Sequence, residues 1–124
     1  MSSVSKLLLL AEQDLENSRL LLENERYRAS ISRAYYAMYY STQALLDAKK
    51  IASRTHKGMI QQFGQHFVKT GTFSTDTSKQ LSDAYDLRQI SDYAADALVD
   101  REAAEKALSA SVEFVEKVRT YLTR

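Results

Sequence analysis

The stretch from Leu87 to Tyr93 holds the residues whose types and spacing are best suited to chemistry. On a helix, Tyr85, Arg88 and Asp92 share one stripe, so charged groups occupy positions where the apolar period expects aliphatic side chains. One interpretation is an ion pair between Arg88 and Asp92, which stabilises an exposed helix by only about 0.3–0.5 kcal/mol. The other is that the planar guanidinium of Arg88 binds a phosphate or carboxylate in a cleft, with Asp92 holding it in place. The sequence leaves both interpretations open.

A second stretch, from Arg33 to Tyr40, is rich in tyrosine. Its tyrosines are Tyr35, Tyr36, Tyr39 and Tyr40. Because successive helical residues point about 100° apart, these rings cover more than half of the helix circumference, and the helix is predicted to be central. Small residues at Ala34 and Ala37 let a neighbouring helix approach closely. The cluster is interpreted as packing, as a dimer or partner interface, or as a platform for stacking nucleic-acid bases.

Other chemical motifs point to no metal and no cofactor. His56 and His66 are ten residues apart, whereas two zinc ligands on one helix face need a spacing of three or four. A capping or surface role is therefore predicted for both histidines. The chain has no cysteine, which excludes a thiolate metal site and a cysteine nucleophile. It also lacks a phosphate-cradling glycine loop and a glycine-flanked serine.

The elements that must position these residues follow from the apolar period, which predicts five helices. The first helix ends near Asn24, and the second runs from Tyr27 to Leu45. The third spans 55–69 and stops before Gly71. The fourth is capped by Ser74 or Asp76 and reaches Ala95, and the fifth begins after its cap, Asp100. In the fifth helix, an apolar seam suits antiparallel packing against another long helix. The prediction is an all-α fold, an antiparallel bundle of four long helices plus one short helix, in one domain over residues 1–124.

Composition agrees with one ordinary globular domain. The 124 residues include 17 basic and 16 acidic side chains, giving a net charge of +1, and 44% are hydrophobic. No apolar run approaches the roughly 20 residues of a membrane span, and no leader is evident, so we expect a soluble, unprocessed, cytoplasmic protein without a membrane partner. Positive residues concentrate on and after the second helix, as a solvated rim or an RNA-contacting surface. They are Arg26, Arg28, Arg33, Lys49, Lys50, Arg54 and Lys57.

Three stretches resemble a known family. Residues 32–39, Ser-Arg-Ala-Tyr-Tyr-Ala-Met-Tyr, resemble the second-helix signature of HEPN domains, the nucleotide-binding domains of higher eukaryotes and prokaryotes. Residues 55–58, Thr-His-Lys-Gly, with Phe63 and Gly64, resemble the segment that follows in one small prokaryotic subfamily. Residues 87–93 resemble the fourth-helix motif of that subfamily. The resemblance covers nearly the whole chain, with the three stretches in the expected order.

The resemblance implies a bundle of four or five helices that forms a homodimer and is paired with a minimal nucleotidyltransferase as toxin and antitoxin. It also implies a metal-independent ribonuclease, whose motif is an arginine followed after four to six residues by a histidine. In the dimer, two copies of this motif meet in one cleft, where the arginine binds the scissile phosphate and the histidine helps to move the proton. Here Arg88 takes the arginine position, and Tyr93 stands where the histidine is expected.

Two functions therefore stay open. In the first, a homodimeric ribonuclease toxin acts on RNA with Arg88, Asp92 and Tyr93 as catalytic residues. Asp92 is then a candidate base, because tyrosine titrates near pH 10 and is a poorer proton carrier at neutral pH than histidine. In the second, the chain is a non-catalytic nucleotide- or protein-binding subunit of its nucleotidyltransferase partner. The family resemblance implies that such a partner attaches AMP to Tyr93 or, as second choice, Tyr85, which would place negative charge beside Arg88 and block the cleft.

Overall fold

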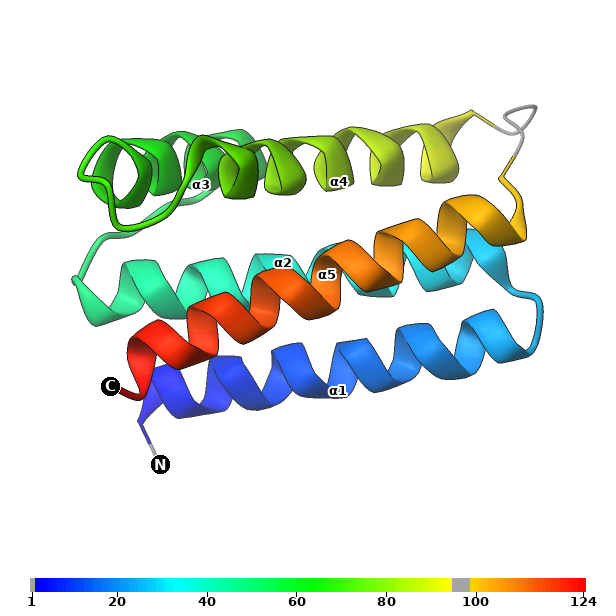
Figure 1. Cartoon of the computed structure of the whole chain (residues 1–124), viewed down its shortest axis with the longest axis horizontal. Coiled ribbons are helices and arrows are strands. Elements are labelled where there is room, and N and C mark those ends of the chain that lie inside the picture. The colour runs from blue at the N-terminus through cyan, green and yellow to red at the C-terminus, as the bar shows by residue number, and fades with distance from the viewer. Residues whose placement is uncertain (1, 95–98) are drawn as a thin grey trace.

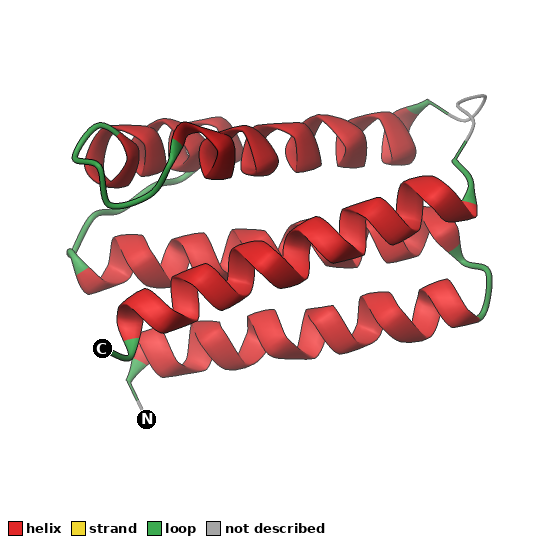
Figure 2. Ribbon diagram, viewed as in Figure 1, coloured by secondary structure: helices red, strands yellow, loops and turns green. Residues whose placement is uncertain are grey.

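A computed structural model of the chain describes residues 2–94 and 99–124. Its elements are α1 (Ser3–Glu23), α2 (Tyr27–Ala48), α3 (His56–Phe63), the π-helical segment η1 (Gly64–Val68), α4 (Thr75–Tyr93) and α5 (Arg101–Leu122). Every element within these ranges is helical (Figure 2). The predicted all-α fold of four long helices and one short one is confirmed. The predicted extension of the fourth helix to Ala95 lies outside the described residues.

The helix α2 is the centre of the bundle. It packs against α1, α3, α4 and α5. Figure 1 shows α1 and α2 running antiparallel, with α5 crossing them and α3 with α4 on the side of α2 that faces away from α1. The central position predicted for the tyrosine-rich helix is therefore confirmed. Within the described ranges, no helix combines the length and the apolar character needed to cross a membrane.

Short polar side chains fix where the helices begin. The hydroxyl of Ser74 accepts a hydrogen bond from the backbone N–H of Thr77 at 3.2 Å, which makes Ser74, rather than Asp76, the N-cap of α4. The carboxylate of Asp100 accepts from the N–H of Ala103 at 2.9 Å and caps α5 as predicted. Each of these bonds satisfies a backbone donor that the first turn of a helix leaves without a partner.

Two buried clusters hold the helices together. The aromatic cluster joins α3, η1 and α5 through Phe63, Phe67, Phe73 and Phe114. A second cluster of smaller side chains joins α1, α2 and α5 through Ala11, Leu15, Ala37, Leu108 and Val115. The hydroxyl of Ser111 donates to the backbone carbonyl of Ala34 at 2.7 Å, so α5 approaches the backbone of α2 closely where a small residue was expected to permit it.

Candidate functional site

The helix α4 holds Arg88 against α2. Its Nε atom lies 2.8 Å from Oδ2 of Asp92, and Nη2 donates to the hydroxyl of Tyr36 at 3.2 Å. The side chains of Arg88 and Asp92 are 15% and 29% exposed. The ion pair expected from the spacing of four residues is present, and both groups still reach solvent. Among the described residues, Nη1 of Arg88 makes no hydrogen bond, and Nε pairs with Asp92 as an ion pair without hydrogen-bond geometry.

A second guanidinium adjoins the same ring. The central carbon of Arg33 lies 4.8 Å from the centre of the Tyr36 ring, and that of Arg88 lies 5.3 Å from it. Nη1 of Arg33 pairs with Oδ1 of the buried Asp14 at 3.2 Å. The electron-rich face of an aromatic ring attracts cations, so Tyr36 stabilises two neighbouring positive groups that would otherwise repel each other.

The end of α1, the start of α2 and the end of α4 line an open cavity next to Arg33 and Asp92. Its volume is about 450 Å³. The lining residues are Leu21, Arg28, Ala29, Ser32, Arg33, Ser91 and Asp92. Arg28 donates to the backbone carbonyls of Ser91 and Ala94 and so joins α2 to the last turn of α4. Two of the basic residues singled out in the sequence, Arg28 and Arg33, thus border the same cavity as Asp92.

The helix α3 brings His56 into the tyrosine cluster. Its Nδ1 lies 2.6 Å from the hydroxyl oxygen of Tyr35, and four tyrosine rings surround its ring, with centres 4.9–6.0 Å away. The predicted capping or surface role is therefore wrong for His56, because Thr55 supplies the cap and His56 is half-buried. Among the described residues, no three His, Cys, Asp or Glu side chains lie close enough to hold a metal ion.

Burial and charge set the protonation states of this histidine and its partner. Burial, and the positive charge of Arg88, lower the pKa of His56 below its ordinary value of 6.5. Burial among other phenols raises the pKa of Tyr35 well above its ordinary value of 10. At neutral pH His56 is therefore uncharged and Tyr35 keeps its proton, so the 2.6 Å contact is a hydrogen bond between two neutral groups.

The remaining residues singled out in the sequence are placed as follows. Tyr93, the last residue of α4, is 76% exposed. Tyr85 is half-buried; its hydroxyl accepts from Nε2 of Gln89 at 2.9 Å, and its ring centre lies 5.8 Å from that of His56. The structure thus brings Arg88 and Asp92 into contact and leaves Tyr93 open to solvent. Sequence reasoning missed the partnership of Arg88 with Tyr36 and the neighbourhood of His56.

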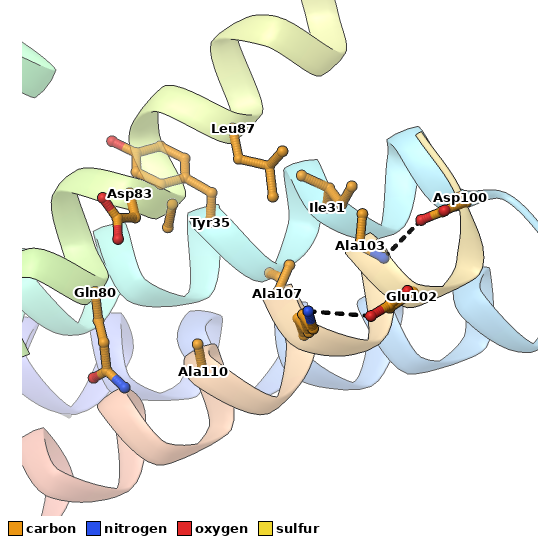
Figure 3. Close-up of a pocket in the computed structure, with 13 residues that line it drawn as sticks. Ile31, Tyr35, Gln80, Asp83, Leu87, Asp100, Glu102, Ala103, Ala107 and Ala110 are labelled. Atoms are coloured by element: carbon orange, nitrogen blue, oxygen red, sulfur yellow. Dashed lines mark hydrogen bonds and ion pairs between the residues drawn. The ribbon is translucent and has the colours of Figure 1, made fainter. Parts of the chain in front are cut away.

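A second cavity lies between α4 and α5 and is also lined by side chains of α2; its volume is about 490 Å³ (Figure 3). Its walls are mainly aliphatic, with Ile31, Leu87 and Ala107 among them, and acidic side chains stand at its edge. Arg88 does not line it. Tyr35 is one of the residues that line this cavity, and its hydroxyl is hydrogen-bonded to His56, so this residue contacts both the cavity and His56.

Known proteins of similar sequence are found in archaea and bacteria. "Putative toxin MJ0142" of Methanocaldococcus jannaschii is 35% identical over 119 residues, which cover 96% of this chain and 81% of that protein. "Putative toxin MJ0605" of the same organism is 33% identical over 96% of this chain and 88% of its own length. A "UPF0332 protein", glr0978 of Gloeobacter violaceus, is 34% identical over 92% of this chain and 91% of its own.

The fold also recurs in a solved structure, that of TT1696 from Thermus thermophilus. It superposes with a TM-score of 0.82 over 97% of this chain and 98% of that chain, at 16% sequence identity. The likeness therefore speaks to the fold alone. The model of the HEPN domain family matches residues 4–121. Together with relatives that are at least 33% identical along nearly the whole chain, this match means that the chain belongs to the HEPN domain family.

Proposed function

We propose that the chain is the toxin of a toxin–antitoxin-like pair and that it cleaves RNA without a metal ion, as a homodimer. The observation that carries the proposal is the state of Arg88, whose guanidinium is oriented by Asp92 and Tyr36 and whose Nη1 makes no hydrogen bond among the described residues. A guanidinium fixed in this way is suited to a phosphate, because its planar donors match phosphate oxygens. Two relatives of the chain carry the name "Putative toxin", which supports the assignment as a toxin.

The chemistry assigned to the site is attack by an RNA 2′-hydroxyl on the adjacent phosphorus. Negative charge then grows on the non-bridging oxygens, and Arg88 stabilises it in the transition state. The cavity lined by Arg28 and Arg33 would take a neighbouring phosphate of the same strand. Oδ2 of Asp92 is engaged by Nε of Arg88, so in this proposal Asp92 positions the guanidinium instead of acting as the base.

The test is incubation of the purified protein with labelled tRNA or total RNA in EDTA, read on a gel. We expect cleavage that survives the chelator and leaves a 2′,3′-cyclic phosphate and a 5′-hydroxyl. The same RNA with the 2′-hydroxyl removed at the cleavage position is the matched control, and it should stay intact. Absence of cleavage at micromolar protein, or cleavage that depends on added Mg²⁺, would contradict the proposal.

A second candidate function is favoured by the exposure of Tyr93, which is 76%. In this case the chain is the non-catalytic partner of a nucleotidyltransferase, and the hydroxyl of Tyr93 attacks the α-phosphorus of ATP. The new bond joins the phenolic oxygen to AMP, pyrophosphate leaves, and the phenolic proton passes to solvent. Tyr85 is the poorer acceptor, because it is half-buried and its hydroxyl is bonded to Gln89.

Mass spectrometry after incubation with ATP and a minimal nucleotidyltransferase tests this second function. We expect the mass of one added AMP, lost in Tyr93→Phe and kept in the control variant Tyr85→Phe. An unmodified wild-type chain, or a Tyr93→Phe chain that is still modified, would count against it.

A further inference from the structure

His56 has one ring nitrogen engaged and one open. Nδ1 is bonded to the hydroxyl of Tyr35 at 2.6 Å, and among the described residues no group forms a hydrogen bond with Nε2. Tyr35 is 1% exposed and belongs to the central helix α2. A ring nitrogen held by a rigid partner fixes both the orientation of an imidazole and the role of its other nitrogen. When the imidazole proton is on Nδ1, Nδ1–H donates to the hydroxyl oxygen of Tyr35, and Nε2 carries the lone pair that a base needs.

His56 also lies near Arg88, the residue proposed to bind the phosphate. Its ring centre is 6.0 Å from that of Tyr36, the ring whose hydroxyl accepts from Nη2 of Arg88. The charge of Arg88 is one of the two causes that lower the pKa of His56, burial being the larger. Both effects keep the imidazole unprotonated at neutral pH, which is the state that a general base needs before the reaction begins.

We propose that His56 is the general base of this site and that Nε2 removes the proton from the RNA 2′-hydroxyl whose phosphate Arg88 holds. This rests on the proposed ribonuclease function. The 2′-oxygen forms a bond to phosphorus, its proton passes to Nε2, and Nδ1–H donates to the hydroxyl oxygen of Tyr35. The bond from phosphorus to the 5′-oxygen breaks, and the leaving oxygen takes a proton from water. His56 then returns its proton to solvent, so the step is balanced.

The other candidates for this role are less well placed. The carboxylate of Asp92 forms an ion pair with Nε of Arg88 at 2.8 Å. Protonating this carboxylate would weaken the ion pair that positions Arg88. Tyr93, the last residue of α4, is 76% exposed and is not among the rings that surround His56. His56 has an uncharged imidazole at neutral pH, and in the described part of the chain its Nε2 makes no hydrogen bond. Tyr35 is a positioning residue, because it acts through His56.

The experiment measures single-turnover RNA cleavage and RNA affinity in EDTA for the wild type, His56→Asn, Tyr35→Phe and Arg88→Ala. His66→Asn is the matched control, since it removes the other histidine of the same chain segment. We expect His56→Asn to cleave about 10²–10⁴-fold more slowly with its Kd for RNA within about threefold of the wild type. Tyr35→Phe should lower the cleavage rate roughly tenfold, and His66→Asn should cleave at the wild-type rate. Arg88→Ala should lose both rate and affinity.

The pH profile gives a readout that a structural role would not move. His56 is faced by Tyr35, Tyr36 and Tyr39 of α2 and by Tyr85 and Arg88 of α4. A base is lost when it is protonated, so the wild-type rate should fall as the pH drops through a value below 6.5, and this limb should vanish in His56→Asn. Should His56→Asn fail to fold, a wild-type profile without an acid limb overturns the proposal by itself.

The outcomes separate this inference from the function on which it rests. A wild-type protein that cleaves no RNA overturns both. A folded His56→Asn variant that cleaves at the wild-type rate, while Arg88→Ala is inactive, overturns only the role of His56 and leaves the ribonuclease in place. A parallel loss of rate in His66→Asn also contradicts the assignment, because it would trace the effect to the segment and not to Nε2 of His56.

Discussion

Replacing Arg88 with alanine is expected to slow RNA cleavage by about 10²–10³-fold, the loss typical of removing one preorganised donor to a developing oxyanion. Asp92 and Tyr36 now orient the guanidinium before RNA arrives, so its contribution needs no rearrangement during the reaction. The affinity for RNA should fall as well, because a phosphate contact is lost in the ground state. Single-turnover cleavage and binding measured in EDTA check both expectations.

The same substitution should leave the protein folded. Removing one partner of a fully buried ion pair costs about 3–5 kcal/mol, because the other charge is stranded. Asp92 is 29% exposed, so water solvates its carboxylate once Arg88 is gone, and we expect a loss nearer 1 kcal/mol in urea unfolding. A loss of several kcal/mol, with RNA cleavage unchanged in the molecules that remain folded, would make Arg88 a structural ion.

Lys79 provides the matched control for Arg88. It belongs to the same helix and pairs with Asp83 four residues later at 2.7 Å, but both side chains are well exposed. Lys79→Ala therefore removes a positive charge and an ion pair of the same spacing, without touching Tyr36 or His56. It should change neither cleavage nor stability by a measurable amount. If Lys79→Ala reduced cleavage as Arg88→Ala does, the effect would belong to the overall charge of α4.

The helices could be predicted because a bundle buries one stripe of each of them. The seam predicted for α5 includes Leu122, which is half-buried. Its other members are buried, as a period of alternating three and four residues requires; they are Ala104, Leu108, Ser111, Val115 and Val118. The π-helical segment after α3 could not be predicted in this way. This segment is identified by the hydrogen bond from the N–H of Lys69 to the carbonyl of Gly64, five residues earlier. Adding one residue to a helical turn depends on how Phe67 packs in the finished core, not on local spacing.

In the candidate site, too, contacts within one helix could be predicted from the sequence, whereas contacts between helices could not. Arg88 and Asp92 could be paired from the sequence, because four residues on one helix always place two side chains on one face. The contact of His56 with Tyr35 joins residues 21 positions apart, across the connection between α2 and α3. No local spacing encodes that distance. The surplus of tyrosines on α2 indicated that some hydroxyl needed a partner, and His56 is the partner that the folded chain supplies.

The aromatic cluster is where a core substitution should cost most, and Phe63→Ala should lower the free energy of unfolding by about 3–5 kcal/mol. Phe63 is 0% exposed. Its ring centre lies 6.1, 5.6 and 5.7 Å from those of Phe67, Phe73 and Phe114. These three rings belong to η1, to the connection before α4 and to α5, so they cannot close together over the space without moving several elements. Urea unfolding followed by circular dichroism measures the loss.

This substitution also tests what holds His56 in the site. Phe63 is the last residue of α3 and His56 is the first, so the phenylalanine anchors the short helix that carries the histidine. Hydrogen exchange in Phe63→Ala should rise first in α3 and least in the seam of α5, since local openings follow the loss of buried contacts. Ile90→Ala, at a side chain that is 51% exposed, is the control and should cost less than about 0.5 kcal/mol. A Phe63→Ala loss as small as that of the control would mean that other contacts hold α3, and with it His56, against α2.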